Sequence, residues 1–243
     1  MATAFDHYET HLGPIYSWMV GDIEAALARS AAELEALNLP EKASGTAIDL
    51  GAGFGLHALP LAQRGYSVTA IDSCRRLVEE LKTRSDGLPI TTVTADILSF
   101  PEFLQQPADV ILCMGDTLTH LSSPTLVATL LAATARSLAK GGMFVTTFRD
   151  YVTTPLQGER RFILVRSDEQ RILTCFLEYS EDKVIVHDLL HQRENDHWCQ
   201  HVSSYPKLRL APEWVASLLI NHGLEVRRDT SSGGMVRVVA TKS

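Results

Sequence analysis

Three glycines at alternate positions, Gly51, Gly53 and Gly55, follow a short apolar run and precede a helix-like stretch. Because glycine has no Cβ, such a backbone can turn sharply and a ligand can lie directly against it. The dinucleotide-binding fingerprint has its third glycine one position later, where this chain has Leu56. The lysine and hydroxyl residue of a P-loop are also missing. The spacing therefore indicates a ligand-binding turn and argues against NAD.

Three aspartates in strand-like runs could bind the polar groups of a nucleoside. A carboxylate at Asp72, the end of one run, suits the two hydroxyl donors of a ribose. Asp96 could accept from an adenine amino group while Ile97 covers the ring, or it could simply cap a turn. Asp49 lies inside an apolar run, where a carboxylate is costly without partners. Local backbone amides are the alternative partners for Asp49.

Strand-like and helix-like stretches alternate up to about residue 150 and must position these residues. The predicted strands are 46–53, 67–72, 90–96, 108–115 and 143–151. The predicted helices are 23–37, 56–65, 74–84 and 124–142. This alternation predicts an α/β fold with a doubly wound, mostly parallel seven-stranded sheet and helices on both faces.

In such a sheet, ligands bind beyond the carboxyl ends of the strands. The strand ends should therefore surround one site, at Asp49, Asp72, Asp96, Met114 and Arg149.

Beyond residue 155 the runs are strand-like and are joined by short polar turns, which permit only antiparallel pairing. These runs are 161–167, 171–179, 183–192 and 197–205. The sheet pattern then resumes with a helix at 211–223 and strands at 224–230 and 235–243 around a Gly-Gly turn. We therefore predict an antiparallel β-meander at 156–205, as a substrate cover or subunit interface, inserted into a core of 41–155 and 206–243.

The composition limits the class of protein. Lys and Arg total 22 against 29 Asp and Glu, a formal charge of −7, which lacks the basic footprint of a nucleic-acid-binding protein. No apolar run approaches the roughly 20 residues that span a bilayer. Acids stand where a secretory signal would be basic, and four cysteines lack CxxC spacing. We expect a cytoplasmic protein that acts on a small molecule, without nucleic-acid or membrane partners.

With these motifs in order, residues 45–150 resemble the class I S-adenosylmethionine-dependent methyltransferases, which have a Rossmann-like fold. The resemblance implies S-adenosyl-L-methionine as cofactor. It places the glycine turn near the methionine part, Asp72 at the ribose and Asp96 at the adenine. The expected cofactor-binding residues are Asp49, Gly51, Ala52, Gly53, Gly55, Asp72, Ser73, Asp96, Ile97, Met114 and Trp18.

A narrower resemblance, to the glycine and glycine/sarcosine N-methyltransferases, lies in GDTLTHL, FRDY and SSYPKLRL. The family has asparagines where this chain has Asp116 and Asp150. The resemblance implies that Arg149 binds a substrate carboxylate as a bidentate fork. The alternative for Arg149 is a salt bridge with a neighbour such as Asp150. His120 could contact the substrate or act as a base, and Asp116 could orient an amine.

We therefore predict N-methylation of a small amine or amino acid. The run Met114-Gly115-Asp116-Thr117 differs from the [D/N]-P-P-[Y/F] motif of enzymes that methylate base amines or glutamine amides. Methylation at oxygen or another atom of a small metabolite stays open. So do an inactive cofactor-binding partner subunit and, from another enzyme class, a nucleotide-dependent oxidoreductase.

Family members use an N-terminal segment as a lid, so residues 1–40 are predicted to be a helical lid. Tyr16 is a candidate catalytic residue, and Tyr16 and Trp18 could stabilise a sulfonium through their ring faces. Alternatively, these aromatics only pack the first helix onto the sheet.

A cluster of histidines lies in HDLLHQRENDHWCQH. With a hairpin turn around Asn195, strand alternation would place His187, His191, Cys199 and His201 on one face. These residue types bind zinc, but a slip of one residue in the register would scatter them. A solvated or subunit-facing strand face is the alternative, so we predict no metal site and leave a homo-oligomer open.

Overall fold

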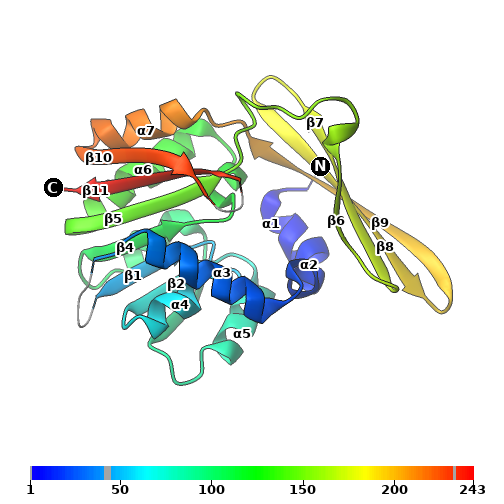
Figure 1. Ribbon diagram of the computed structural model, residues 1–243, viewed down its shortest axis with the longest axis horizontal. Helices are drawn as coiled ribbons and strands as arrows, with labels where there is room; N and C mark the ends of the chain where they lie inside the picture. Colours follow the sequence, from blue (N-terminus) through cyan, green and yellow to red (C-terminus); the bar gives the residue numbers. More distant parts are fainter. Residues whose placement is uncertain (1, 41–44, 232–233) are drawn as a thin grey trace.

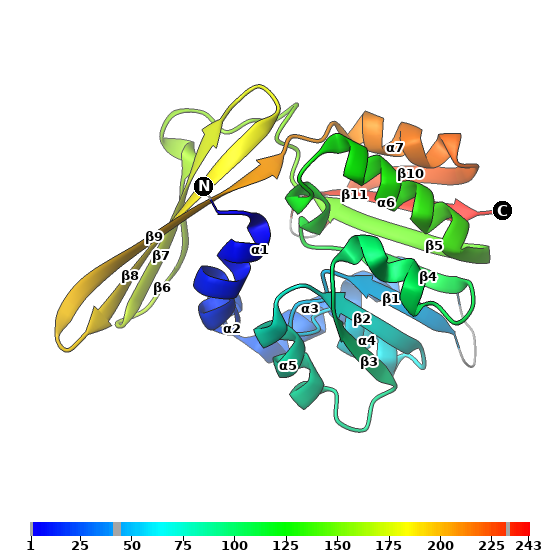
Figure 2. The ribbon, with the colours of Figure 1, turned by 180° about the vertical axis from the view of Figure 1, so that it is seen from behind.

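The computed structural model describes residues 2–40, 45–231 and 234–243. Within them the chain forms one seven-stranded sheet and one four-stranded sheet. The N-terminal helices lie between the two sheets (Figures 1 and 2). The larger sheet, the N-terminal helices and the four-stranded sheet therefore meet beyond the carboxyl ends of the parallel strands.

The larger sheet has the strand order β10-β11-β5-β4-β1-β2-β3. Strands β1 to β5 are parallel, and β11 is antiparallel to both β5 and β10. Its strands are β1 Thr46–Leu50, β2 Ser67–Asp72, β3 Ile90–Thr94, β4 Ala108–Cys113, β5 Leu138–Phe148, β10 Leu224–Thr230 and β11 Val236–Lys242. The predicted doubly wound, mostly parallel sheet is confirmed. The predicted Gly-Gly turn between β10 and β11 includes residues 232–233, which lie outside the described residues.

Helices cover both faces of this sheet because its central strands are apolar on both sides. Every residue of β4 is buried. Val110 and Leu112 pack with the helices of one face, and Ile111 and Cys113 pack with those of the other. The first face carries α3 Ile23–Ala36, α4 Ala58–Gln63 and α5 Arg75–Arg84; the second carries α6 Pro124–Ser137, α7 Pro212–Asn221 and η3 Ile97–Phe103. Every helix among the described residues is too short or too polar to cross a lipid bilayer.

The predicted helix at 124–142 is wrong at its C-terminal end. Helix α6 ends at Ser137, and β5 begins at Leu138, five residues earlier than the predicted strand. The pairing of β4 with β5 shifts register there, from Ala108 with Leu138 to Val110 with Met143. The two glycines therefore lie in an irregular stretch of β5 and do not stop the helix.

The four-stranded sheet is the predicted meander, with strands in chain order. Its strands are β6 Phe162–Ser167, β7 Arg171–Tyr179, β8 Lys183–Glu194 and β9 His197–Leu208. A short 3-10 helix, η5 Gly158–Arg161, precedes β6. Strand β9 runs three residues past the predicted limit of 205 before the chain returns to the core. The division into lid, core and insertion stays a prediction.

The expected common face of the histidine cluster is wrong. Asn195 and Asp196 both have positive φ and form a two-residue hairpin turn, so Glu194 pairs with His197. In this register His191 lies opposite Gln200, not Cys199. His187 and His191 therefore share one face of the sheet, while Cys199 and His201 lie on the other. Within the described ranges, no group of three or more His, Cys, Asp or Glu side chains could hold a metal ion.

The N-terminal segment packs on one face of the meander. It comprises α1 Ala4–His7, the π-helix η1 Tyr8–Leu12, the 3-10 turn η2 Gly13–Ile15 and α2 Tyr16–Val20. Leu12 and Ile15 pack against Leu173 and Leu190 of the meander. These four residues therefore form an apolar cluster between the N-terminal segment and the meander, separate from the apolar clusters on the two faces of the larger sheet.

Candidate active site

A cavity of about 620 Å³ lies beyond the carboxyl ends of β1 to β4. The N-terminal segment covers it with Phe5, Tyr8, Glu9 and Tyr16. Ten of the residues proposed from the sequence line it together: Tyr16, Gly51, Ala52, Gly53, Asp72, Ser73, Asp96, Ile97, Met114 and His120. The topology therefore gathers the glycine turn and two of the three strand-end aspartates around one space.

The glycine turn is held against β2 by its own backbone. The N–H groups of Gly51 and Ala52 both donate to the carbonyl of Ile71, at 2.8 and 3.0 Å. Gly53 has φ of +55°, and a Cβ added there would meet nothing within 4 Å, so this side of the turn faces open space. At Gly55 an added Cβ would lie 2.3 Å from a Leu81 methyl carbon. Gly53 therefore leaves room in the cavity, whereas Gly55 allows the helices to pack.

Asp72 is tied to the glycine turn and to the start of α5. Its Oδ2 accepts the N–H of Gly53 at 2.8 Å, and its Oδ1 accepts the N–H of Cys74 at 2.8 Å. Burial raises the pKa of Asp72, and these backbone hydrogen bonds oppose that rise. A carboxylate oxygen can accept more than one hydrogen bond. Each oxygen of Asp72 therefore keeps acceptor capacity for a ligand hydroxyl.

Asp96 both caps a helix and lines the cavity. Its Oδ1 accepts the N–H of Leu98 at 2.8 Å at the start of η3. Ile97 lines the cavity beside it. Asp96 is exposed, and among the described residues its second carboxylate oxygen accepts no backbone hydrogen bond. The capping role and a ligand-binding role are therefore compatible.

Asp49 lies just behind the cavity lining and is 1% exposed. Its Oδ2 atom has no hydrogen-bond partner among the described residues. Burial, and next the charge of Asp72, raise the pKa of Asp49 to about 7, although a hydrogen bond from the Ala58 backbone opposes this. A buried acceptor without a donor is costly, so Asp49 has unused capacity beside the glycine turn.

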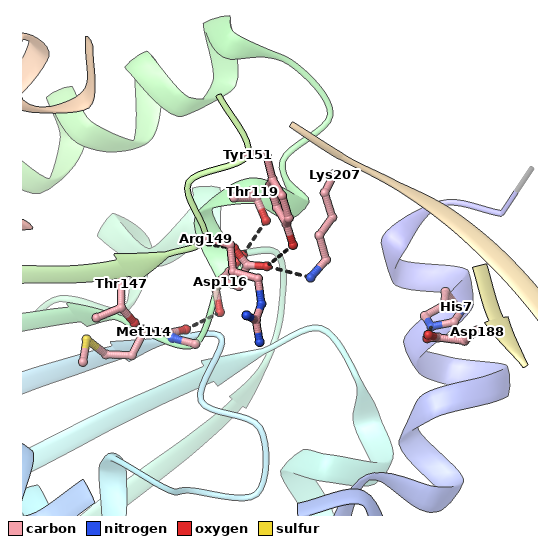
Figure 3. A network of polar contacts seen from close by, with 11 residues as sticks. His7, Met114, Asp116, Thr119, Thr147, Arg149, Tyr151, Asp188 and Lys207 are labelled. Atoms are coloured by element: carbon pink, nitrogen blue, oxygen red, sulfur yellow. Dashed lines mark hydrogen bonds and ion pairs between the residues drawn. The ribbon is translucent and has the colours of Figure 1, made fainter. Parts of the chain in front are cut away.

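The other end of the cavity is built around Asp116, in the loop after β4. Asp116 is 4% exposed and adopts φ of +78°. Its carboxylate accepts the N–H of Arg149 at 2.9 Å, the hydroxyl of Tyr151 at 3.1 Å and the ammonium of Lys207 at 2.7 Å. Figure 3 shows Tyr151, Thr119 and Lys207 converging on it. The Asp116 carboxylate is therefore engaged by internal donors, and Asp116 lies behind the residues that line the cavity.

Lys207 was not among the residues proposed from the sequence. It belongs to β9 of the meander, and its side chain is 11% exposed. Burial lowers the pKa of Lys207, but Asp116 and Tyr151 raise it more, so the pKa lies above its ordinary value. Its only sequence signal is the SSYPKLRL run, because the partner, Asp116, is distant in the chain.

His120, at the end of the 3-10 helix η4 Thr117–His120, lines the cavity between two tyrosines. Its ring centroid lies 5.4 Å from that of Tyr8 and 5.8 Å from that of Tyr205. The Nε2 atom is buried and has no hydrogen-bond partner in the described part of the chain. Burial, and next the charge of Lys207, lower the pKa of His120 to about 3. The imidazole is therefore neutral at pH 7.

Arg149 follows β5, and its side chain is exposed. Within the described ranges, the alternative ion pair with Asp150 is not formed, and Asp150 accepts the N–H groups of Val152 and Thr153 at 2.9 and 2.8 Å. Among the described residues, the Arg149 guanidinium makes no hydrogen bond or ion pair. It therefore stands next to Asp116 with its donors unused.

Two aromatic residues of the N-terminal segment have different surroundings. Tyr16 lines the cavity, with its ring 5.9 Å from that of Phe54. Trp18 instead lies against the meander, where its indole N–H donates to Asp168 and the guanidinium of Arg166 is 5.6 Å from its ring. Trp18 is thus outside the described lining of the cavity because α2 turns this side chain toward the β6–β7 hairpin.

Sequence comparisons give the following relationships. Residues 47–142 match the family model described as a methyltransferase domain. The glycine/sarcosine N-methyltransferase of Aphanothece halophytica is 29% identical over 153 residues, which cover 60% of this chain and 57% of that relative. The matched region therefore spans less than two thirds of that relative's length.

Solved structures share the fold across most of the chain. An S-adenosylmethionine-dependent methyltransferase from Clostridium acetobutylicum is 14% identical, with a TM-score of 0.75, covering 89% of this chain and 92% of its own. CalS10, an amino pentose methyltransferase from Micromonospora echinaspora solved with bound SAM, is 16% identical, with a TM-score of 0.77, covering 96% and 97%. At these identities the likeness concerns the fold.

Proposed function

We propose that this chain, which carries a class I S-adenosylmethionine-dependent methyltransferase domain, transfers the methyl group of that cofactor to the nitrogen of a small amine. The observation that carries the choice of nitrogen is His120. It is a half-buried, neutral imidazole whose Nε2 atom is unpartnered among the described residues, and it lines the same cavity as the glycine turn and Asp72. This arrangement suits an acceptor that carries an N–H group.

The residues at the strand ends fit the cofactor. Gly53 leaves open space where a side chain would project, and Asp72 keeps acceptor capacity on both oxygens. Asp72 and Ser73 would hold the ribose, and Asp96 and Ile97 would hold the adenine. The glycine turn would lie along the methionine part, with the orphaned Oδ2 of Asp49 behind it.

When bound, S-adenosylmethionine supplies a methyl group on positively charged sulfur, so an amine lone pair forms the N–C bond, the C–S electron pair passes to sulfur, and the positive charge passes to nitrogen. His120 would accept a hydrogen bond from the amine N–H and thereby aim the lone pair. With a pKa of about 3, its ring is too weak a base to deprotonate an ammonium ion, and it stays neutral beside the cationic product. His120 is therefore proposed as a substrate contact and not as a base.

Arg149 would bind an acidic group of the substrate. Arg149 is exposed, its guanidinium is unpaired in the part of the chain that the structure describes, and a planar fork matches a carboxylate with two parallel hydrogen bonds. The relative from Aphanothece halophytica is named for glycine and sarcosine, which both carry a carboxylate next to an amine nitrogen. We therefore propose amino acids, or similar amines with a nearby carboxylate, as the substrate class.

The N-terminal segment would close the cofactor side. Tyr8 and Tyr16 are half-buried and line the cavity, and loss of solvent around their hydroxyls raises the pKa of both phenols. Neutral tyrosine rings can face a cation without carrying charge of their own. Residues 2–20 are therefore proposed to act as a cover that excludes water from the reacting atoms.

The test is methyl transfer from S-adenosylmethionine labelled in its methyl group to a panel of glycine, sarcosine, larger amino acids, amino sugars and simple amines. We expect an N-methylated product. His120→Asn should lower kcat/KM by about 10- to 100-fold, whereas the exposed His222→Asn should not. A product methylated at oxygen would support the O-methyltransferase alternative. Cofactor binding without any product would support the inactive partner subunit.

A further inference from the structure

We propose that Lys207 is a positioning residue for the methyl-accepting half of the site. Through Asp116, its ammonium holds both the loop that carries His120 and the backbone that carries Arg149. This inference rests on the proposed function, because it concerns the same acceptor.

The contact between Lys207 and Asp116 joins the inserted meander to the core. The Nζ atom lies 2.7 Å from Oδ2, and the two side chains are 11% and 5% exposed. Burial raises the pKa of Asp116, but Lys207, His120 and hydrogen bonds lower it more, so the carboxyl stays ionised. Removing one partner of a buried pair leaves the other charge without compensation. Neither residue can therefore be changed without disturbing the other.

Asp116 in turn fixes the loop around it. Its N–H donates to the carbonyl of Thr147 at 3.0 Å, and its carbonyl accepts the N–H and hydroxyl of Thr119 at 3.1 and 2.7 Å. A residue other than glycine at φ of +78° persists only when its surroundings hold it there. Gly115, Thr117 and His120 of this loop line the cavity. A shift at Asp116 would therefore move the cavity wall.

The charge of Lys207 also reaches His120. The groups that face this imidazole are Tyr8 of η1, Tyr205 and Lys207 of β9, Asp116 of its own loop and His7 of α1. Lys207 and His7 disfavour a proton on His120, and Asp116 favours one. Lys207 thus helps to keep the acceptor nitrogen of His120 unprotonated, in addition to its mechanical role.

Three variants test this role. Lys207→Met removes the charge, Lys207→Arg keeps it, and Lys207→Met combined with Asp116→Asn removes both charges so that no buried carboxylate is stranded. Lys183→Met, at the start of β8 in the same sheet, is the matched control. The readouts are kcat and KM for the amine, the Kd of S-adenosylhomocysteine and amide hydrogen exchange at residues 115–120.

Lys207→Met should lower kcat/KM for the amine by about 100-fold, because a displacement of about 1 Å at the reacting atoms can cost that much. The Kd of S-adenosylhomocysteine should change by less than about threefold, since Asp72 and the glycine turn are untouched. Lys207→Arg should restore activity to within about tenfold of the wild type. The double variant should fold and stay about 100-fold slow, and Lys183→Met should match the wild type.

Two measurements separate this inference from the proposed function. Hydrogen exchange at residues 115–120 and NMR titration of His120 can be followed in the S-adenosylhomocysteine complex, without turnover. Two results would support the role of Lys207 even if the wild type methylates no amine. They are faster exchange at residues 115–120 in Lys207→Met and in the double variant, and a raised pKa for His120 in Lys207→Met. Unchanged exchange in folded Lys207→Met or the double variant, with wild-type kcat/KM wherever turnover is measurable, would overturn it.

Discussion

The Oδ2 atom of Asp72 accepts the backbone N–H of Gly53 at 2.8 Å, which ties the end of β2 to the turn that follows β1. The other oxygen accepts the N–H of Cys74 at the start of α5. One carboxylate thus joins three elements at the cavity wall. Asp72 thus shapes the turn, and we propose that its remaining acceptor capacity binds the ribose.

Replacing Asp72 should weaken cofactor binding. In Asp72→Asn one carboxylate oxygen becomes an NH₂ group, which faces one of the two backbone donors, Gly53 or Cys74, and one acceptor is lost. We expect the Kd of S-adenosylhomocysteine to rise by about 10- to 100-fold, or about 1.5–3 kcal/mol, measured by calorimetry. Asp86→Asn, at an exposed aspartate, is the control. An unchanged Kd in folded Asp72→Asn would exclude the ribose role.

Gly53 and Gly55 should respond differently to alanine. Both have positive φ, so each variant carries backbone strain of about 1 kcal/mol. Gly53→Ala places a methyl group in open cavity space and should chiefly weaken cofactor binding. Gly55→Ala forces a Cβ to 2.3 Å from Leu81 and should lower the free energy of unfolding by more than about 2 kcal/mol. Calorimetry measures cofactor binding and chemical denaturation measures the free energy of unfolding for each variant. Equal free energies of unfolding for the two variants would contradict this prediction.

The residues that the sequence identified correctly as neighbours are those whose position follows from strand ends. In a parallel sheet, any residue that ends a strand meets the others at one edge, so Gly53, Asp72 and Asp96 could be placed together without knowing how side chains pack. Long apolar runs such as β4 were equally clear, because strands buried on both faces need apolar residues throughout.

The missed features depend on tertiary packing or on register. The role of Lys207 depends on its ion pair with Asp116, which lies 91 positions earlier in the chain. The predicted common face of the histidine cluster is wrong because the Asn195–Asp196 hairpin shifts the pairing of β8 with β9 by one residue. Such a shift places each β9 side chain on the opposite face from the one predicted. Trp18 could not be assigned from helix periodicity, since its partner Asp168 belongs to the inserted sheet.

Asp49 should make stability depend on pH. Its pKa is raised to about 7 in the folded protein, against about 3.9 in an unfolded chain. Between these values the folded state binds the extra proton, so the contribution of Asp49 to the free energy of unfolding falls as pH rises from about 4 to 7 and is constant above that. Asp49→Asn keeps the acceptor for Ala58 and removes the ionisation.

Chemical denaturation of Asp49→Asn and the wild type at pH 5 and pH 8 tests this. The variant should gain about 1–4 kcal/mol relative to the wild type between the two pH values, since each unit of pKa shift corresponds to about 1.4 kcal/mol. Comparing the two proteins cancels the other titrating groups. A constant difference across the range would show that Asp49 does not titrate there.

His7 should anchor the N-terminal cover. It is fully buried, with its ring nitrogens 2.7 Å from the Ser203 hydroxyl and 3.0 Å from Asp188, and its ring stacks on Tyr205 at 4.0 Å. His7→Ala leaves Asp188 buried and unpartnered by the ring, so we expect a loss of about 2–4 kcal/mol of stability. It should also raise cofactor Kd and speed limited proteolysis within residues 2–22. His222→Ala is the exposed control, and unaltered proteolysis would remove the anchoring role.

Arg149 should discriminate among amines by their acidic group. Because Arg149 is exposed and its guanidinium has no partner among the described residues, Arg149→Ala should leave the fold and the Kd of S-adenosylhomocysteine unchanged. It should raise KM for amino acids by about 10- to 100-fold. Amines without a carboxylate should be unaffected. Arg149→Lys should fall between the two, since an ammonium supplies charge without the bidentate fork. Arg160→Ala, at an exposed arginine of η5, is the control. Equal KM values for amino acids in wild type and Arg149→Ala would show that the substrate carboxylate, if there is one, binds elsewhere.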